Sequence, residues 1–261
     1  MKRTYSLILI LVPMLLLIST TVKSDEEFPV RSLYPKVSPI ELEELYNRLD
    51  EVVVFDVRSS YEYETLHIKG SKHLALNDRE FEEKLKQLRA DTDKPFVFYC
   101  NGHTCKKSYK ATQKAMRERI ANVIVFDAGI FDWTKAYPDE AVLLGQTPVN
   151  PSDLLDKEKL AAHMLEPEAF GRLVHQNSIV LDIRDNLQKA AISLFPMKQH
   201  SVPLDNNSLK TYVDQAKQEN KTLLIYDAVG KQVRWLQYYL EAQGISSYYF
   251  MKGGAKAFLK Y

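Results

Sequence analysis

The sequence predicts an α/β fold of two similar domains, each a parallel β-sheet flanked by helices. Two observations predict it. Four short pieces of the chain occur twice, in the same order and with similar spacing. Apolar, β-branched runs also alternate with amphipathic helical stretches, a pattern typical of parallel strands buried on both faces. The 261 residues suffice for two domains of roughly 100 residues each.

The repeated pieces are read as strands with their flanking loops. Val52–Arg58 is matched by Ile179–Arg184, and both end in Asp-aliphatic-Arg. The other matched pairs are His73–Leu76 with Ser201–Leu204, Pro95–Cys100 with Thr222–Asp227, and Val123–Gly129 with Ser247–Gly253.

Helices are expected between these strands. Ser38 is placed to N-cap a helix that runs through Leu49, with a proline in the first turn and a glutamate at the third helical position. Lys106–Arg119 and Gln232–Ala242 have helical spacing after the third strand of each repeat, and Gly244 ends the latter helix.

Composition divides the chain into an N-terminal leader and two domains. The first domain is predicted at 36–140 and the second at 164–261. The linker, 141–163, contains Pro148 and Pro151 and a short helical stretch.

Residues 1–24 are predicted to be a secretory signal peptide. Lys2 and Arg3 precede an apolar run at 7–18, and small polar residues follow at 19–24. The run is short for a membrane-spanning helix. We therefore expect a periplasmic or secreted protein, with an uncleaved membrane anchor as the alternative. Contact with a membrane is expected only in that alternative.

The charge balance argues against a nucleic-acid partner. Lys and Arg number 35 and Asp and Glu 34, so the net charge is +1 and no basic excess is present. The only cysteines, Cys100 and Cys105, are too few for a disulfide framework and too close to constrain the unfolded chain strongly. Their role is therefore interpreted as chemical rather than architectural.

Cys100 is the candidate nucleophile, because it ends an apolar strand and precedes a loop and a helix. Ligands of open α/β sheets bind beyond the carboxyl ends of the strands. Inward-pointing N–H groups of such a loop and the helix N-terminus stabilise a thiolate. The alternative is an inert, buried strand-end cysteine. The candidate loop comprises Asn101, Gly102, His103, Thr104, Cys105 and Lys106, with Lys107 adding a second cation.

Several of these segments together resemble the rhodanese family. The resemblance covers nearly everything from about Ser38 to the C-terminus, and the motifs fall in the family's order. They are Phe55–Arg58 for Asp-Val-Arg, Tyr61–Tyr63 for the Glu-Tyr pair, His67–Leu74 for His-Ile-x-Gly before a short strand, Tyr99–Cys100 for the active-site loop, and Asp127–Gly129 with Trp133 for the closing Gly-x-x-x-Trp element.

The resemblance implies a sulfurtransferase. Cys100 would accept a sulfane sulfur as a persulfide and pass it to a nucleophilic acceptor. Asp56 and Arg58 would be structural and would tie the first strand to the active-site loop. The implied partners are a small sulfur-containing anion, such as thiosulfate, or a protein thiol or persulfide. No cofactor and no metal are implied.

The loop departs from the common rhodanese pattern, which has Arg as its sixth residue. Cys105 occupies that position here, and Lys106 follows it. Counting seven residues, the loop is as long as that of the related dual-specificity phosphatases and arsenate reductases. Those enzymes need a bidentate Arg, which Lys does not replace, so phosphatase activity is not expected. A Cys-Asn-Gly-x-x-Cys loop also resembles a rhodanese subgroup.

The second repeat has Asp227 where the nucleophile would stand. A carboxylate cannot carry sulfane sulfur and would neutralise an anion pocket. Asp182 and Arg184 are retained. This half resembles the inactive domain of tandem rhodaneses, and it either walls the active-site cleft, contacts a partner or serves only as a packing partner.

Two other functions remain open from the residues. Cys100 and Cys105 can act together in thiol–disulfide exchange or redox sensing; within a sulfurtransferase, Cys105 would shield the persulfide or resolve it as a disulfide. A non-catalytic binding module is the other alternative. In such a module His103 and the two thiols could bind copper or zinc, although a histidine in a loop is more often an ordinary polar side chain without a metal.

Overall fold

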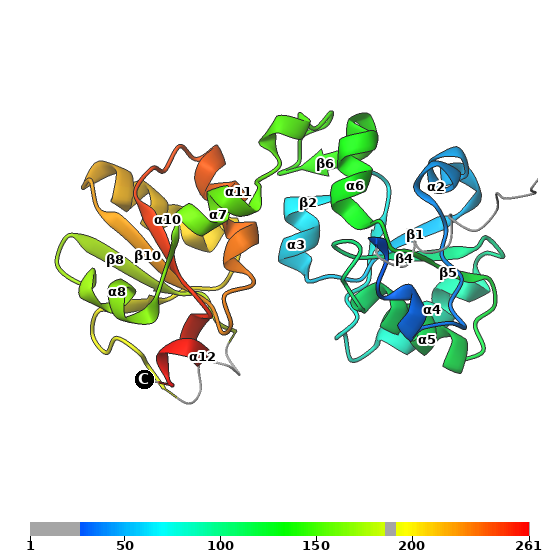
Figure 1. Ribbon diagram of the computed structural model, residues 1–261, viewed down its shortest axis with the longest axis horizontal. Coiled ribbons are helices and arrows are strands. Elements are labelled where there is room, and N and C mark those ends of the chain that lie inside the picture. Colours follow the sequence, from blue (N-terminus) through cyan, green and yellow to red (C-terminus); the bar gives the residue numbers. More distant parts are fainter. Residues whose placement is uncertain (1–26, 186–191, 261) are drawn as a thin grey trace, which may run out of the picture.

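The computed structural model describes residues 27–185 and 192–260 and shows two parallel β-sheets flanked by helices (Figure 1). The first sheet has the strand order β3-β1-β4-β5 and the second β7-β11-β10-β8-β9. Neighbouring strands within each sheet are parallel. The predicted α/β class, with its two parallel sheets, is confirmed.

The first half of the chain holds the first sheet and a small antiparallel pair, β2 with β6. Its elements are α2 (Leu42–Asn47), β1 (Val53–Asp56), α3 (Ser60–Thr65), β2 (Leu66–Ile68), β3 (Lys72–His73), α4 (Phe81–Ala90), β4 (Phe96–Tyr99), α5 (Lys107–Arg117), β5 (Val123–Phe126), α6 (Gly129–Ala136) and β6 (Ala141–Leu143).

The second half repeats this alternation after a short helix in the linker. Its elements are α7 (Lys157–Ala162), β7 (Met164–Leu165), α8 (Pro167–Arg172), β8 (Ser178–Asp182), β9 (Gln199–Ser201), α10 (Asn206–Gln218), β10 (Thr222–Tyr226), α11 (Val233–Ala242), β11 (Tyr248–Met251) and α12 (Gly254–Phe258).

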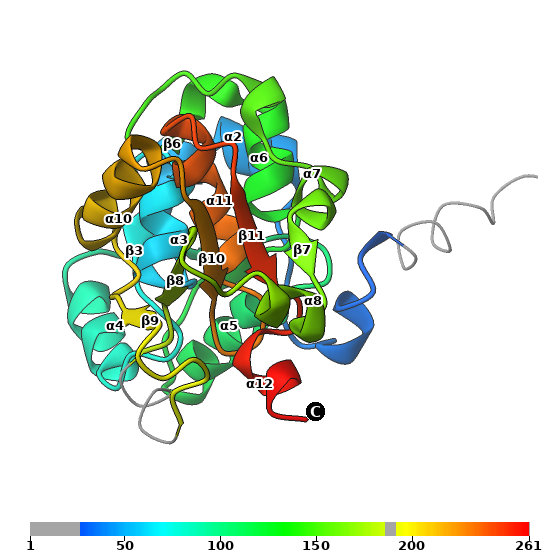
Figure 2. The ribbon, with the colours of Figure 1, turned by 90° about the vertical axis from the view of Figure 1, so that its left-hand side faces the viewer.

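Alternating side chains of the strands bury both faces of each sheet. On one face of the first sheet, Phe55 and Phe98 pack with Phe81 of α4 and Ala111 of α5. The other face packs against α2 and α6, where Trp133 is fully buried. The second sheet is likewise covered by α10 and α11 on one face and by α8 and α12 on the other (Figure 2).

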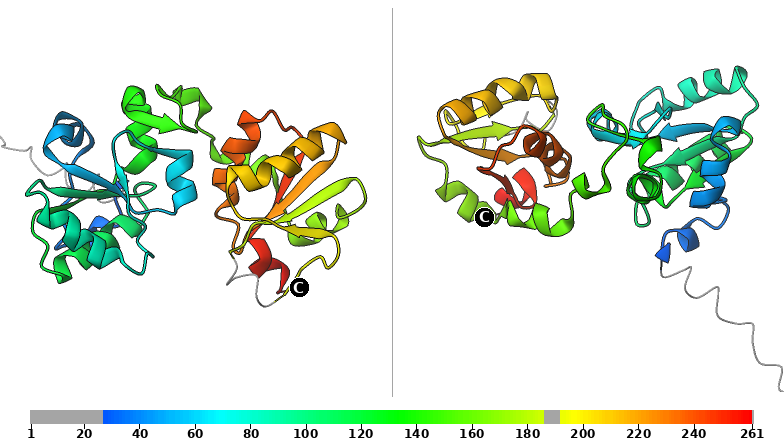
Figure 3. Two further views of the ribbon diagram at one scale, coloured as in Figure 1. Left: turned by 180° about the vertical axis from the view of Figure 1, so that it is seen from behind. Right: turned by 90° about the horizontal axis from the view of Figure 1, so that it is seen from above.

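One apolar cluster continues from the first half into the second. It joins residues of α6 to residues of α11, and Phe131 stacks on Trp235 with ring centroids 5.6 Å apart. In Figure 1, α11 faces α3 across the boundary between the halves. The connection from β6 to α7 passes along one side of the molecule (Figure 3). The predicted linker begins with β6, which pairs with β2 of the first half.

Strand registers relate the two halves residue by residue and correct one of the predicted matches. Tyr99 pairs with Phe126, whereas Tyr226 follows Ile225, which pairs with Phe250. With Tyr99 aligned to Tyr226, Phe126 corresponds to Met251 rather than to Phe250. The predicted match was therefore wrong by one residue, and it would have placed equivalent side chains on opposite faces of the sheet. Gly129 then corresponds to Gly254.

The predicted helix from Ser38 begins later than expected. The N–H of Ile40 donates to Val125 and the N–H of Val125 donates to Ser38, so this segment extends the edge of the first sheet. Glu41 is the N-cap of α2, without a side-chain capping bond. The expected N-cap at Ser38 was wrong because pairing with β5 satisfies its backbone.

The predicted signal peptide, 1–24, lies outside the described residues. Within 27–185 and 192–260, none of the helices combines the length and the apolar character that crossing a bilayer requires.

Candidate active site

The loop after β4 lies where the carboxyl ends of β1, β4 and β5 meet. The N–H of Ile130 donates to the carbonyl of Cys100, which ties the start of α6 to the loop. Gly129 has φ +71°, and an added Cβ there would lie 2.6 Å from the backbone of Asn101. Close contact between two backbones therefore fixes the loop.

Cys100 is buried and Cys105 is only partly buried. The Cys100 residue is 1% exposed and packs with the apolar face beneath α4 and α5. The structure places the two sulfur atoms at bonding distance, as a disulfide, with the Cα atoms 6.5 Å apart. The other hydrogen-bonding neighbours of Cys100 Sγ in the described chain are the Ser108 hydroxyl at 3.3 Å and the Cys105 carbonyl at 3.5 Å. The expected backbone N–H groups of the loop do not point at Sγ in this disulfide form.

A buried arginine links the first strand to the loop. Arg58 donates to both oxygens of Asp56, with Nε 2.9 Å from Oδ1, and neither side chain is exposed. Its Nη1 donates to Asn101 Oδ1 at 3.2 Å. The ring of Trp235, from the second half, lies 5.0 Å from the guanidinium carbon. A well-paired guanidinium under an aromatic ring is a rigid support for the residue that follows Cys100.

Glu62 supports the same loop from α3. Its carboxylate accepts from the Ser59 N–H in a capping box, from Asn101 Nδ2 at 3.4 Å and from Lys107 Nζ at 3.3 Å. Burial alone would raise the pKa of Glu62. The charges of Lys107 and Arg58 and the hydrogen bonds from Ser59 outweigh burial, so the pKa is lowered. Glu62 therefore holds Lys107 beside the loop as a carboxylate.

The remaining loop side chains point toward the surface or toward α6. His103 Nε2 lies 2.6 Å from Asp132 Oδ2, and its ring stacks on Phe28. Thr104 and Lys106 are exposed, and Gly102 has φ +144°. Among the described residues there is no group of three or more His, Cys, Asp or Glu that could hold a metal ion.

A cleft of about 1020 Å³ lies over the loop, between the two halves. Cys105 lines it, whereas Cys100 does not. Loop residues, α6, the linker and the start of α11 form its walls, with Phe131 and Trp235 as aromatic surface. Six cationic side chains line it against four carboxylates, so the cleft suits an anion. The cations are Lys106, Lys107, Lys135, Lys157, Lys231 and Arg234.

The corresponding loop of the second half is filled by its own carboxylate. Asp227 accepts from the backbone N–H groups of Val229 at 2.8 Å, Gly230, Gln232 at 2.5 Å and Val233 at 3.3 Å. A strand-end loop of this shape therefore can direct several N–H groups at one anionic side chain, and here the Asp227 carboxylate accepts from them.

The comparisons with known proteins concern mainly the first half. A family model described as the rhodanese-like domain matches residues 39–136. The first half is rhodanese-like. This match supports the rhodanese family at the level of that segment and leaves the finer activity open.

Two relatives of this rhodanese-like segment are informative. The chain is 29% identical over 107 residues to the thiosulfate sulfurtransferase GlpE of Coxiella burnetii, covering 41% of this chain and 92% of the relative. It is 30% identical over 106 residues to a tRNA uridine(34) hydroxylase of Cytophaga hutchinsonii, covering 40% of this chain. The match spans a third of the hydroxylase's length. These relatives support a sulfurtransferase-type family.

Among solved structures, the chain is similar to a thiosulfate sulfurtransferase from Pseudomonas aeruginosa at 19% identity. That similarity covers 88% of this chain and 45% of the other, with a TM-score of 0.39.

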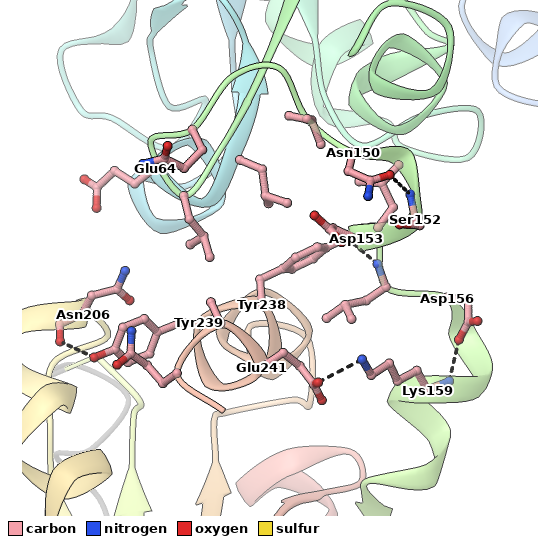
Figure 4. A pocket seen from close by; sticks show the side chains of 18 of the residues that line it. Glu64, Asn150, Ser152, Asp153, Asp156, Lys159, Asn206, Tyr238, Tyr239 and Glu241 are labelled. Atoms are coloured by element: carbon pink, nitrogen blue, oxygen red, sulfur yellow. Dashed lines mark hydrogen bonds and ion pairs between the residues drawn. The ribbon is translucent and has the colours of Figure 1, made fainter. Parts of the chain in front are cut away.

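A second cavity, of about 830 Å³, lies toward the C-terminal end of α11 (Figure 4). None of the residues Cys100 to Lys106 lines it. Two of its charged groups pair with each other: Lys159 Nζ lies 2.9 Å from Glu241 Oε2, and Asp156 accepts from the Lys159 N–H. The cavity shares Leu154, Leu155 and Asp156 with the cleft over the rhodanese-like loop.

Sequence reasoning missed the residues that reach the loop from elsewhere. Ser108 was read only as part of a helix, Glu62 only as part of a motif and Trp235 only as a helix-spaced apolar residue. The signal for Trp235 was available in its position, because it follows the loop of the second half and opens α11. Its contact with Arg58 depends on how the two halves pack, which no local pattern encodes.

Proposed function

We propose that the protein is a sulfurtransferase that carries a sulfane sulfur as a persulfide on Cys100. The observation that supports this most strongly is the placement of Cys100 at the end of β4, in a rhodanese-like segment, with its loop beneath a cation-rich cleft. The relatives named as thiosulfate sulfurtransferases agree with that chemistry.

The transfer takes two displacement steps. The Cys100 thiolate attacks the outer sulfur of thiosulfate; the sulfur–sulfur bond of the donor breaks, and sulfite leaves with the electron pair. A thiophilic acceptor then attacks the terminal sulfur of the persulfide, and the electron pair returns to Cys100. With cyanide as the acceptor, the product is thiocyanate. The Ser108 hydroxyl, 3.3 Å from Sγ, would donate a hydrogen bond to the thiolate.

Cys105 gives the persulfide a second fate. Its thiolate can attack Cys100 Sγ of the persulfide and displace hydrosulfide, which leaves the Cys100–Cys105 disulfide. The proximity of the two sulfur atoms supports this step. An acceptor that arrives first would take the sulfur, so Cys105 limits the lifetime of an unused persulfide.

The test is intact-mass analysis of the reduced protein after exposure to thiosulfate. We expect the wild type to gain one sulfur atom and to lose it to cyanide as thiocyanate. Cys105→Ser should gain the sulfur and hold it longer, whereas Cys100→Ser should gain none. Equal loading of Cys100→Ser, or no loading of Cys105→Ser by any sulfane donor, would contradict the proposal.

Thiol–disulfide chemistry is the second candidate function, favoured by the bonded placement of Cys100 and Cys105. Its signature in the same experiment is a loss of two hydrogens by the wild type, with no gain of sulfur by Cys105→Ser and no release of hydrosulfide. We also propose that the protein is exported, since an oxidising compartment would keep this pair oxidised until a thiol opens it. A protein that neither gains sulfur nor loses hydrogens would instead be a binding module that uses the cleft.

A further inference from the structure

The two sulfur atoms of the candidate site differ in their surroundings. Cys100 is 1% exposed and belongs to the buried cluster of Phe55, Phe98 and Ala111, against which Cys105 packs from outside. Cys105 is partly exposed and lines the cleft. A molecule that enters the cleft therefore meets the sulfur of Cys105 and not that of Cys100.

Thiol–disulfide exchange magnifies this difference, because the attacking thiolate approaches along the sulfur–sulfur axis, opposite the leaving sulfur. Cys100 is buried beneath α4 and α5, so an attacking thiolate has little access to its sulfur. Cys105 is partly exposed and lines the cleft. Exposure therefore selects Cys105.

The leaving sulfur is also better supported at Cys100. Ser108 is buried, and its hydroxyl lies 3.3 Å from Cys100 Sγ, where it can donate to a thiolate. Cys100 lies before the N-terminus of α5, a helix of 11 residues, which favours negative charge. A thiolate that is stabilised leaves faster.

We propose that Cys105 is the exchange site at which an external small thiol opens the Cys100–Cys105 disulfide. The thiolate attacks Cys105 Sγ, the sulfur–sulfur bond breaks, and Cys100 leaves as a thiolate with the electron pair. A second thiolate then attacks the external thiol's sulfur in the mixed disulfide; the oxidised, dimeric thiol forms, and Cys105 leaves as a thiolate with the electron pair. Two thiols are oxidised and one protein disulfide is reduced.

The preferred thiol is anionic. Lys106 and Lys107 follow Cys105 in the chain, and Lys231 and Arg234 of the second half line the same cleft. These charges raise the local concentration of an anionic thiol relative to a neutral one of similar size. The exchange frees Cys100, but it needs no sulfane sulfur and does not depend on the proposed sulfur transfer.

The experiment uses the full chain, oxidised with diamide and then treated briefly with 2-mercaptoethanesulfonate. The reaction is stopped with acid, and free thiols are blocked with N-ethylmaleimide. No Lys or Arg lies between Cys100 and Cys105, so trypsin keeps both in one peptide, and fragmentation of that peptide assigns each label. We expect the mercaptoethanesulfonate adduct on Cys105 and the maleimide on Cys100.

Single-cysteine variants give an independent measurement. Reacted with the symmetric disulfide of the same probe, Cys100→Ser should be modified faster than Cys105→Ser by about tenfold or more, and the difference should vanish in urea. Neutral 2-mercaptoethanol should open the wild-type disulfide more slowly than the sulfonate does. Adducts on Cys100, adducts shared equally, or a pair that cannot be oxidised would overturn the proposal. Because sulfur loading is measured on reduced protein, its failure is separate from any of these.

Discussion

At the scale of single residues, the two halves differ most in the side chain that ends the central strand of each sheet, β4 in the first and β10 in the second. Asp227 gathers four backbone N–H groups, whereas Cys100 has the Ser108 hydroxyl and the bonded sulfur of Cys105. The substitution of Asp for Cys therefore does more than remove a nucleophile, because the carboxylate organises the loop.

Asp227→Ala is expected to lower the free energy of unfolding by about 2–3 kcal/mol, because several backbone N–H groups lose their common acceptor at once. Asp205→Ala is the control. Asp205 is the N-cap of α10, and its side chain accepts from the Ser208 N–H, so its loss should cost about 1 kcal/mol, as is typical of an N-cap. Urea unfolding of both variants checks the difference; equal losses would mean that the Asp227 loop keeps its shape without the carboxylate.

The ionisation of Glu62 is expected to make the free energy of unfolding depend on pH. Its pKa is lowered in the folded protein, because the charges of Lys107 and Arg58 and the Ser59 hydrogen bonds outweigh burial. A lowered pKa stabilises the fold above the unfolded value of about 4.3, and that stability is lost as the pH falls through the folded value. Glu62→Gln should therefore be less stable than wild type by about 1 kcal/mol at pH 7.

The gap between wild type and Glu62→Gln should narrow as the pH falls below the unfolded value of about 4.3. It should close once the pH is below the lowered pKa of folded Glu62, where the wild-type carboxyl is protonated. Urea unfolding at pH 7, 5, 4 and 3 measures it. A gap that stays constant across this range would show that the side-chain amide, and not the missing charge, causes the loss.

At the scale of elements, strands were easier to predict than their exact alignment. The long apolar runs correspond to β1, β4, β8 and β10 as predicted, because continuous apolar runs are typical of buried strands. The short pieces at His73–Leu76 and Ser201–Leu204 overlap β3 and β9 by only one residue each. The match of Phe126 to Phe250 failed because identical residue types suggested it, whereas register follows from backbone pairing. The predicted helix start at Ser38 was wrong because the backbone of this segment pairs with Val125, and no local capping signal reveals that pairing.

The approach of α6 to the active-site loop predicts a strong effect at Gly129. Its φ of +71° would strain an alanine, and the added Cβ would clash with the backbone of Asn101 and Gly102. Gly145→Ala is the matched control, because Gly145 has φ +79° and nothing within 4 Å of the added Cβ. We expect Gly145→Ala to cost about 1–2 kcal/mol and Gly129→Ala at least about 3 kcal/mol.

Urea unfolding and sulfur loading should be measured on both glycine variants. Gly129→Ala should also lose most of its sulfur loading, because the clash displaces the residues next to Cys100. Indistinguishable stabilities would mean that the loop moves away from α6 without strain.

At the scale of the whole molecule, the packing of the two halves forms the site. The sequence predicted a second half that lacks the nucleophile, but it could not show that Trp235 covers Arg58 or that Arg234 lies with its guanidinium 4.4 Å from the ring of Phe131. Such contacts join residues far apart in the chain. The loop of the first half was therefore predictable, whereas the opposite wall of the cleft was not.

The cations of that wall predict how anions reach the active-site loop. In reduced protein that carries Cys100→Ser, Cys105, which lines the cleft, can be alkylated by anionic iodoacetate or neutral iodoacetamide, and the ratio of the two rates reports the potential of the cleft. Lys231→Glu should lower this ratio by about threefold or more at low salt, since Lys231 lines the cleft. Raising the ionic strength from about 0.01 M to about 1 M shortens the Debye length from about 30 Å to about 3 Å, so the effect should largely disappear.

Lys94→Glu is the control, because Lys94 precedes β4 while Cys100 and Cys105 follow its other end. If Lys231→Glu and Lys94→Glu changed the ratio of alkylation rates equally, net charge alone would steer the anion. The second half would then not contribute a wall of the active-site cleft.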